Sequence, residues 1–278
     1  MKSGLTVVIT GAASGIGRAL ALECERRGCT VYAADLSIEA MADMRSPTLH
    51  PLKMDVNSAD DIRELVDRLQ TDAALPDVLI NNAGFGAVAP LLDLPLERLR
   101  LQFETNVFSV VALCQALAPR MAAKGSGRIV NIGSISGVMA TPFAGAYCGT
   151  KAALHVLSDA LRMELKPFGI DVIVVMPSAV RSNFGARAVE SAKPLKPGSL
   201  YQPIARIIEA RAMLSQQQQS ISAEAFAVQM MDAITRKHPA PVIAIGPGAR
   251  LITLLRRFLP LSLIDRVLSG KFELDKCR

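Results

Sequence analysis

Short apolar runs alternate with longer amphipathic stretches along most of this 278-residue chain. The runs include TVVIT at 6–10, TVYAAD at 30–35 and PVIAIG at 241–246, and the amphipathic stretches include Ala59–Gln70. Strands that alternate with helices predict βαβ units, and strands apolar on both sides predict a sheet covered on both faces. We therefore expect a single α/β domain with a doubly wound parallel sheet at residues 1–247, followed by a C-terminal helical extension at 248–278.

Composition restricts the class of protein further. Half of the residues are hydrophobic, aromatics make up 4% and Trp is absent, which favours an aliphatic interior over a β-sandwich. Five cysteines without a CxxC pair predict reduced thiols and a cytoplasmic location, and Met1 stands so close to the first strand that no signal peptide is expected. No metal site is predicted, because the three histidines fit no triad or metal cluster: His50, His155 and His238.

Residues 181–222 interrupt the alternation just after a strand, with SAKPLKPGSLYQP and then SQQQQS. An insertion there lies at the carboxyl ends of the strands, where ligands bind in open α/β sheets. A surface loop with a polar low-complexity spot would explain the composition equally simply. The position favours a substrate lid.

The segment TGAASGIG at 10–17 joins the first strand to a helix. Its glycines permit a sharp exit from the strand and let the backbone and the helix approach a pyrophosphate, while the N–H groups and dipole of the helix start favour phosphate. A tight turn without ligand would suffice if nothing else matched. The segment predicts a Rossmann-type dinucleotide site formed by Gly11, Ser14, Gly15, Ile16 and Gly17.

Asp35 ends the second apolar run, and Leu36 and Ser37 follow it without a cation. A carboxylate there can accept hydrogen bonds from the ribose hydroxyls of NAD and would repel the extra phosphate of NADP. An isolated aspartate after a strand could also be a turn or helix N-cap residue. Its register with the glycine turn predicts NAD as the cofactor, with contacts from Asp35 and Leu36.

Two later strand ends are expected to meet the adenosine half of the cofactor. Asp55, in KMDV, can accept from the adenine amino group beside Val56. The NNAG segment at 81–84 ends the fourth run, and the small Ala83 and Gly84 let the backbone pass beside the adenosine. Asn81 and Asn82 can bond neighbouring backbone, and Asn82 is included in the predicted cofactor site.

Tyr147 and Lys151 are four residues apart in AYCGTKAAL and share one face of the predicted helix. A tyrosine has an ordinary pKa of about 10, and a nearby ammonium lowers it and suits the hydroxyl to proton transfer. Lys151 can also hold the nicotinamide ribose. Such a pair is common on solvated helices, so alone it would indicate no function. Together with the glycine turn upstream, it predicts hydride transfer between a nicotinamide and a carbonyl or alcohol.

TGxxxGIG at 10–17, NNAG at 81–84 and YxxxK at 147–151 stand in the order of the short-chain dehydrogenase/reductase family, which the chain resembles. The resemblance covers roughly the first two-thirds of the chain. It implies a nicotinamide-dependent oxidoreductase. It also implies a homodimer or homotetramer that pairs through the stretches Leu96–Lys124 and Ala146–Lys166.

The same resemblance assigns two further catalytic residues. Ser134, in NIGSISG, matches the family serine and can donate to the substrate oxygen as charge develops; Ser136 fits the spacing less well. Asn106, in ETNVFS, matches the family asparagine, which implies a bound water that connects Lys151 to solvent. An asparagine that merely distorts or caps the helix is the alternative.

The chain departs from the family after the strand that follows the active-site helix. Pro177 is followed by Ser178, where the family has Pro-Gly. A small serine still fits beside a nicotinamide, and the backbone of Val180 and the hydroxyl of Ser182 can orient the carboxamide. We therefore expect nicotinamide contacts from Pro177, Val180 and Ser182.

The segment at 249–268 is apolar but broken by charges and by Pro260. It is a poor membrane span and predicts two short amphipathic helices. Residues 248–278 carry seven Lys or Arg against three Asp or Glu, a net of +4 within the +6 of the chain. The helices either pack on the protein or form a membrane-facing entrance; nucleic acid is not expected, because only Phe258 and Phe272 offer stacking.

The long lid and tail resemble the hydroxysteroid, retinol and acyl-dihydroxyacetone-phosphate reductase branch of the family. This implies a lipophilic secondary alcohol or ketone of the steroid, retinoid or long-chain lipid type. A small polar sugar or a carrier-bound acyl ketone is an alternative substrate. A catalytically silent dinucleotide sensor or scaffold is an alternative function, against which Ser134, Tyr147 and Lys151 are all present.

Overall fold

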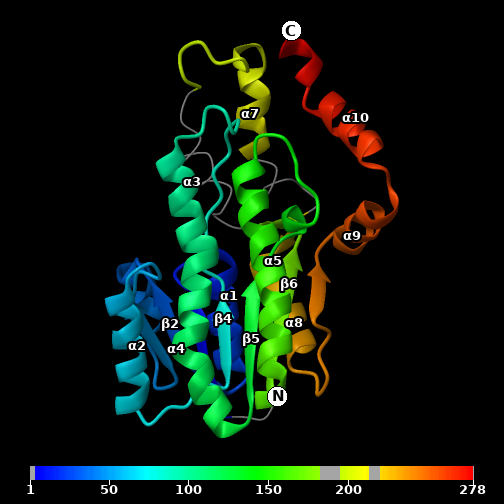
Figure 1. Cartoon of the computed structure of the whole chain (residues 1–278). Coiled ribbons are helices and arrows are strands. Elements are labelled where there is room, and N and C mark those ends of the chain that lie inside the picture. Colours follow the sequence, from blue (N-terminus) through cyan, green and yellow to red (C-terminus); the bar gives the residue numbers. More distant parts are fainter. Residues whose placement is uncertain (1–3, 182–194, 213–219, 278) are drawn as a thin grey trace.

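The computed structural model describes residues 4–181, 195–212 and 220–277 (Figure 1). Seven parallel strands form one sheet in the order β3-β2-β1-β4-β5-β6-β9. The predicted doubly wound sheet is confirmed, and the strand order reverses between β1 and β4, where ligands bind in such folds. The strands are β1 (Thr6–Thr10), β2 (Thr30–Asp35), β3 (Leu49–Lys53), β4 (Val78–Asn81), β5 (Gly127–Ile132), β6 (Ile170–Pro177) and β9 (Val242–Ile245).

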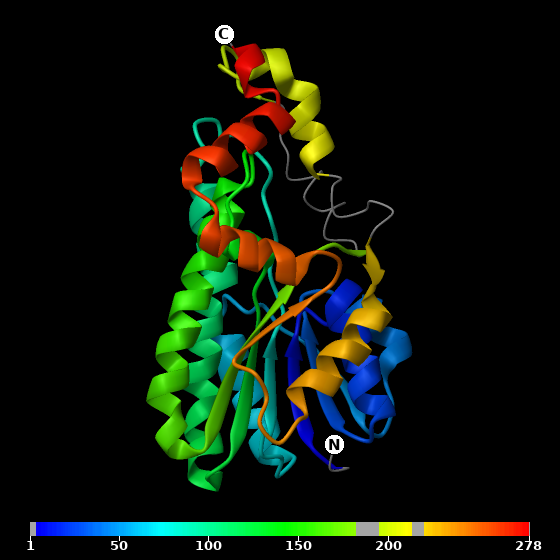
Figure 2. The same ribbon diagram turned by 90° about the vertical axis from the view of Figure 1, so that its right-hand side faces the viewer.

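Helices cover both faces of the sheet (Figure 2). On one face lie α1 (Gly15–Arg26) and α8 (Ala223–Ile234), and on the other lie α2 (Ala59–Thr71), α4 (Ser109–Lys124) and α5 (Gly145–Leu165). Successive strand residues alternate between the two layers: Val7 and Ile9 are buried against the first layer and Val8 against the second. This two-sided burial explains why the strands read as continuous apolar runs.

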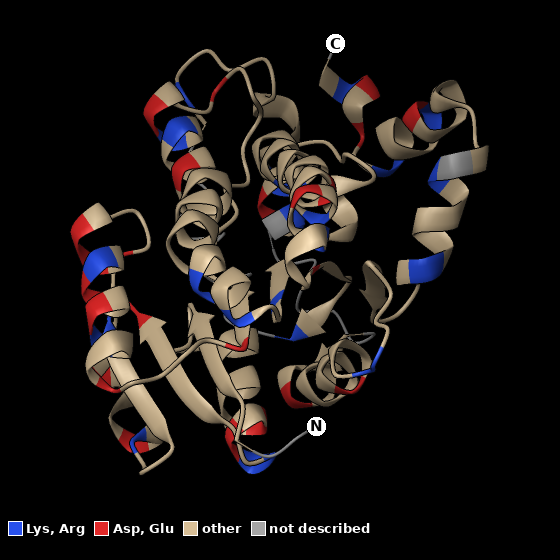
Figure 3. Cartoon of the chain, turned by 60° about the horizontal axis from the view of Figure 1, so that its bottom comes forward, with Lys and Arg blue, Asp and Glu red and all other residues tan. Residues whose placement is uncertain are grey.

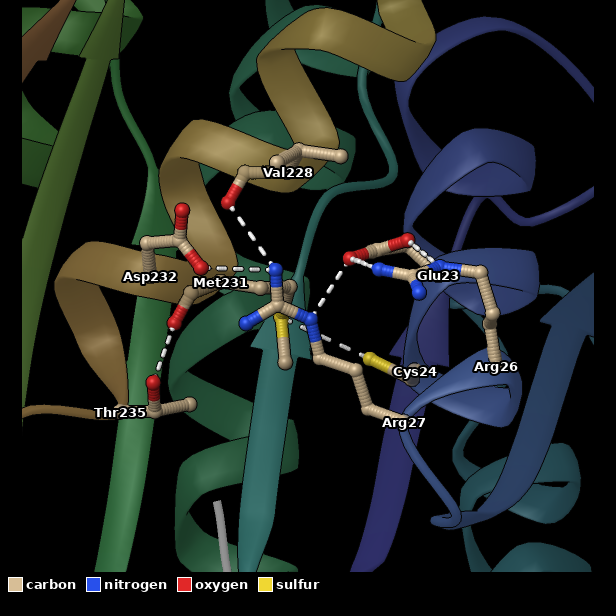
Figure 4. A network of polar contacts seen from close by, with 8 residues as sticks. All are labelled: Glu23, Cys24, Arg26, Arg27, Val228, Met231, Asp232 and Thr235. Atoms are coloured by element: carbon tan, nitrogen blue, oxygen red, sulfur yellow. Dashed lines mark hydrogen bonds and ion pairs between the residues drawn. The ribbon is translucent and has the colours of Figure 1, made fainter.

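Charged groups hold α8 on α1 (Figure 4). Arg27 donates to Glu23 at 2.6 Å and forms an ion pair with Asp232 of α8 at 2.8 Å. The pKa of the Glu23 carboxyl is lowered, chiefly by the hydrogen bond from Arg26 and further by Arg27. The chain segment that returns from the insertion is therefore fixed to the helix that begins at the glycine turn.

The amphipathic stretch Leu96–Lys124 is not one regular helix. It consists of α3 (Leu96–Phe103), a π-helical turn at Glu104–Phe108, and α4. The buried Asn106 lies in this turn, and its side chain bonds the backbone of Phe85 instead of solvent. A π turn of this kind often marks a functional position.

The insertion leaves and re-enters the fold at one point. Residues β7 (Val180–Arg181) and β8 (Ile221–Ser222) pair in a second, two-stranded parallel sheet. Between them lies α7 (Ala205–Ala212). The excursion is thus closed at its base, which suits a segment that covers a site.

The tail forms two helices, α9 (Ala249–Phe258) and α10 (Leu261–Lys271), with the break at Pro260 that its sequence predicts. In both views α10 and the last residues lie beside α7, above the carboxyl ends of the strands (Figures 1 and 2). Phe272 is buried in an apolar cluster, here called the lid cluster, with Val88, Phe143, Ile204 and Ile208. The end of the tail therefore packs on the protein.

Candidate functional site

The glycine turn closes only because side chains are absent from it. Gly11 has φ +68° and Gly15 has φ +54°, in the left-handed region that favours glycine. A Cβ on Gly17 would lie 2.0 Å from the carbonyl oxygen of Gly11. The turn therefore brings the strand end and the first turn of α1 into direct contact.

The start of α1 fits an anionic ligand. Ser14 precedes the helix with an extended backbone, and its side chain does not cap the helix. The first turn, with Gly15, Ile16 and Gly17, carries no acidic residue. The first N–H groups of a helix point outward and need acceptors, so this end fits the pyrophosphate of a dinucleotide.

Asp35 lies against the glycine turn. Its two carboxylate oxygens accept the backbone N–H groups of Ala13 at 3.0 Å and of Ser37 at 3.0 Å, which fixes the carboxylate at the end of β2. Each oxygen retains a lone pair for a further donor. Leu36 is exposed next to it.

The Asp55 segment differs slightly from its expectation. Strand β3 ends at Lys53, so Asp55 lies beyond the strand rather than at its end. The reason is local: Asp55 Oδ1 accepts the N–H of Asn57 at 2.9 Å and its own N–H donates to Asp61 at 2.7 Å, which turns the chain toward α2. Val56 is buried beside it.

The NNAG segment is tied to the end of β1. Asn82 Nδ2 donates to the carbonyl oxygens of Thr10 at 2.9 Å and Gly11 at 3.1 Å. The Thr10 hydroxyl in turn accepts the N–H groups of Asn82 and Ala83, each at 3.1 Å. These bonds place Ala83 against Gly11 of the glycine turn, whereas Gly84 lies beside Asn106 and Lys151. Their contact with the adenosine stays a prediction.

Ser134, Tyr147 and Lys151 come together at the start of α5. The Ser134 hydroxyl lies close enough to the phenol of Tyr147 to act on its pKa. Lys151 is buried, its Nζ donates to the carbonyl oxygen of Ile132 at 2.7 Å, and it lies 5.8 Å from the centroid of the Tyr147 ring. The helix spacing and the end of β5 thus bring three of the four predicted catalytic side chains to one place.

Burial shifts the pKa values of this pair in opposite directions. It raises the pKa of Tyr147 to about 12, which the Ser134 hydroxyl opposes. It lowers the pKa of Lys151 to about 8. The sequence-based expectation that Lys151 lowers the pKa of Tyr147 is not met, since Lys151 Nζ bonds the carbonyl oxygen of Ile132 and lies 5.8 Å from the centroid of the Tyr147 ring.

Asn106 is enclosed by the two segments on either side of it. Its Oδ1 accepts the N–H of Phe85 at 3.0 Å, and its Nδ2 donates to the carbonyl oxygen of Phe85 at 2.9 Å and to Thr150 Oγ1 at 3.1 Å. A Cβ on Gly84 would lie 2.9 Å from Asn106 Oδ1. Asn106 therefore couples the NNAG segment to the helix that carries Tyr147 and Lys151.

The sequence reasoning missed His155. The N–H of Ser134 donates to His155 Nε2 at 3.3 Å, and burial lowers the pKa of the imidazole to about 4. The neutral ring lies so close to the glycines around Ser134 that a Cβ on Gly133 or Gly137 would lie 2.4 or 2.5 Å from it. Because this histidine belongs to no triad or metal motif, its spacing gave no signal.

The segment after β6 is partly described. Pro177 ends β6, and Ser178 packs with its Oγ against Gly246, where no acceptor among the described residues meets it. Val180 is buried in β7. Ser182 lies outside the described residues, as do residues 182–194 and 213–219 of the predicted lid.

An aromatic side chain joins the lid, the tail and the active-site loop. Phe143, four residues before Tyr147, has φ +64°, an unusual backbone conformation for a bulky residue. Its ring meets Tyr201 edge-on at 5.8 Å and Phe272 edge-on at 6.0 Å between centroids. The lid cluster is therefore built directly onto the loop that leads into the catalytic helix.

Comparison with known proteins yields consistent matches. The sequence profile of the family described as short chain dehydrogenase matches residues 5–193. The NADPH-dependent 1-acyldihydroxyacetone phosphate reductase of Saccharomyces cerevisiae is 31% identical, over 97% of this chain and 91% of that protein. An uncharacterized oxidoreductase of Escherichia coli is 33% identical, over 95% of this chain and 94% of that protein.

A solved structure shares the fold nearly from end to end. The short-chain dehydrogenase from Streptomyces avermitilis superposes with a TM-score of 0.81 and 29% identity, covering 99% of this chain and 98% of that one. The similarity therefore includes the lid and the tail as well as the sheet.

Proposed function

Because the chain belongs to the short chain dehydrogenase family and is an oxidoreductase, we propose that it uses NAD to interconvert a lipophilic secondary alcohol and its ketone. The observation that carries the proposal is the meeting of Ser134 and Tyr147 with the buried Lys151, whose Nζ lies 5.8 Å from the centroid of the Tyr147 ring. These groups come after β5 in the chain. Strand β5 is the neighbour of β4, and the NNAG segment at the end of β4 bonds the start of the glycine turn.

The residues fit one proton-coupled step. A bound nicotinamide supplies or accepts the hydride at the carbon that bears oxygen. In reduction Tyr147 gives its phenolic proton to the substrate oxygen, so that C=O becomes CH–OH; in oxidation the proton moves the other way. Ser134 donates to the same oxygen as charge develops. Lys151 holds the ribose and restores the proton, and Asn106 positions a water that links Lys151 to solvent.

The lipophilic substrate is supported by the lid cluster, which places apolar side chains of the lid and tail beside the loop before Tyr147. The Saccharomyces relative is named for an acylated ketone. The test is absorbance of the reduced nicotinamide while alcohols and ketones are screened with either cofactor. Turnover of sterols or long-chain ketones supports the proposal. Turnover only of sugars or carrier-bound acyl ketones overturns the substrate class, and cofactor binding without any turnover favours the sensor.

We expect higher catalytic efficiency with NAD than with NADP. The Asp35 carboxylate is held at the end of β2. Arg18 is bonded to Asp43 at 2.5 Å and to the carbonyl oxygen of Ala40. The 2′-phosphate of NADP would therefore face the negative charge of Asp35. Asp35→Asn keeps an acceptor for a backbone N–H, and Asp35→Ala removes the side chain. Either change should raise efficiency with NADP relative to NAD by about 10-fold.

The matched control for this prediction is Asp55→Asn. Asp55 is proposed to meet the adenine, which NAD and NADP share, so this change should affect both cofactors equally and leave their ratio unchanged. The named cofactor of the Saccharomyces relative is NADPH. A clear NADP preference of the unmodified protein would refute the role given to Asp35.

We expect a homodimer or homotetramer that pairs through α4 and α5. Large apolar side chains are exposed on α5, among them Val156 and Met163, and at Phe108 in the π-helical turn just before α4. The run Leu96–Lys124 is apolar enough by length and composition to span a membrane, but half of its most apolar window is buried in the fold. Light scattering at micromolar concentration checks the assembly: dimers or tetramers should dominate, and Met163→Glu should weaken them. Only monomer in the unmodified protein would contradict this.

We expect a cytoplasmic protein that binds anionic membranes peripherally through α9. Leu251 and Leu254 are more than half exposed there, the helix carries basic but no acidic residues (Figure 3), and Arg236 and Arg250 line a cavity of about 580 Å³ beside it. Apolar insertion and headgroup attraction act together in such helices. Flotation with vesicles rich in phosphatidylserine should recover the protein at low salt and less at high salt.

Leu251→Glu should reduce this recovery several-fold. Leu75→Glu is the control, because Leu75 is exposed to a similar degree in the loop after α2. Both variants must retain cofactor binding. If the unmodified protein stays with the unbound fraction at low salt, α9 is not a membrane anchor.

A further inference from the structure

Helix α7 carries an arginine on its buried side. Ile208 and Arg211 are one turn apart, so they lie on the same face of the helix. Ile208 belongs to the lid cluster, and Arg211 is also largely buried, which lowers the pKa of its guanidinium. Arg206 of the same helix is exposed instead and pairs with Glu273 of the tail at 3.5 Å. Arginine is seldom buried without a charged partner, so Arg211 requires an explanation.

Arg211 reaches toward the catalytic residues. Its Nη2 donates to Thr141 Oγ1 at 2.9 Å, and Thr141 lies in the loop between Ser134 and Tyr147. The charge of Arg211 is close enough to oppose the rise in the pKa of Tyr147 that burial causes, although the Ser134 hydroxyl opposes it more strongly. The guanidinium thus contacts the loop that joins Ser134 to Tyr147, within electrostatic reach of the phenol.

The guanidinium of Arg211 has a buried donor without an acceptor among the described residues. It has five N–H groups, and the bond to Thr141 is the one that it makes within the described residues; its Nε is buried without an acceptor there. The neighbouring groups that act on its pKa are Cys148 and Tyr147, not a carboxylate. Leaving a buried donor unsatisfied destabilises the fold. A guanidinium binds best to two oxygens at once, through two parallel N–H groups. A ligand with two anionic oxygens would therefore satisfy the free donors of Arg211.

We propose that Arg211 binds an anionic group, a phosphate or a carboxylate, carried by the lipophilic alcohol or ketone on which the enzyme acts. This inference rests on the proposed function. The reacting carbon lies at Tyr147 and Ser134, the anionic group at Arg211, and the apolar part along the lid cluster. The phosphates of the cofactor belong elsewhere, at the start of α1, so they do not occupy Arg211.

Calorimetric titration of the full-length protein tests the proposal with three eight-carbon probes: octyl phosphate, octanoate and 1-octanol. We expect at least one of the two anions to bind about 10- to 100-fold more tightly than 1-octanol, the range of a charge-assisted hydrogen bond. Arg211→Met, which keeps much of the volume, should abolish that advantage and leave the affinity for 1-octanol unchanged. Arg206→Met, on the exposed side of α7, should change nothing.

Equal binding of the anions by the Arg211→Met variant and the unmodified protein overturns the proposal. So does an equal loss for anions and alcohol, which indicates a purely structural arginine. The comparison of octyl phosphate with octanoate identifies the preferred anion. If Arg211→Met does not fold, Arg211→Lys keeps a charge without the fork and should show a partial loss for the anions alone; no loss overturns the proposal.

The titration and the turnover assay fail independently. If the unmodified protein turns over no alcohol or ketone, but the Arg211→Met change lowers its affinity for the anions, the anion site stands and the proposed alcohol or ketone substrate falls. If neutral ketones are turned over and anions gain nothing from Arg211, the proposed function stands and the anion site falls.

Discussion

Tyr147→Phe is expected to lower turnover by about 10²–10⁴-fold, the usual contribution of a positioned general acid. Phenylalanine keeps the ring and its place beside Lys151, but it removes the hydroxyl whose proton moves to or from the substrate oxygen. The dissociation constant of the cofactor should change little, because the phenol is proposed to act on the substrate. Steady-state rates and a separate fluorescence titration with the reduced cofactor measure the two quantities.

Tyr32→Phe is the matched control. It also removes a phenolic oxygen, and with it the hydrogen bond that Tyr32 donates to Asp72 at 2.9 Å. Asp72 follows α2 and belongs to no part of the candidate site. Both variants should lose about 1 kcal/mol of stability, and Tyr32→Phe should retain its rate. Wild-type turnover in Tyr147→Phe would remove this residue from the mechanism.

The sheet was predictable because its central strands are buried on both faces and so have nearly unbroken apolar sequences. The runs at 6–10 and 30–35 coincide with β1 and β2. Strand ends were less certain: KMDV continues the apolar pattern, but Asp55 bonds Asn57 and turns the chain. The π turn at Asn106 was hidden for a similar reason, since its cause is a contact with Phe85, 21 residues away.

The candidate site was predictable where its chemistry depends on local spacing. Tyr147 and Lys151 share a helix face, and the glycines of 10–17 share a turn. His155 and Arg211 depend on tertiary contacts instead: one meets the backbone of Ser134, and the other meets a loop 70 residues earlier. Neither residue type stands in a motif, so only the folded arrangement brings them to the site.

Lys151→Met should lower turnover by at least 10²-fold and weaken cofactor binding by about 10-fold, since it removes the proton relay and a charged hydrogen bond to the ribose. Lys166→Met is the control, because Lys166 is exposed just beyond α5. An unchanged cofactor dissociation constant in Lys151→Met would exclude the ribose contact.

The same variant should be more stable than the unmodified protein at neutral pH. Burial lowers the pKa of Lys151 from 10.5 to about 8. Between these values the unfolded chain binds more protons than the folded one. Holding the charged amine in the fold therefore costs about 3 kcal/mol below pH 8, and this cost disappears as the pH rises toward 10.5. Methionine carries no charge, so its unfolding free energy should exceed that of the unmodified protein at pH 7, and the gap should narrow above pH 8. Urea titrations at pH 7 and pH 9.5 measure this gap. If Lys151→Met loses activity and gains stability, the charge of Lys151 is kept for function at a cost to the fold. If the variant is less stable at pH 7, the main role of Lys151 is its hydrogen bond to the carbonyl oxygen of Ile132.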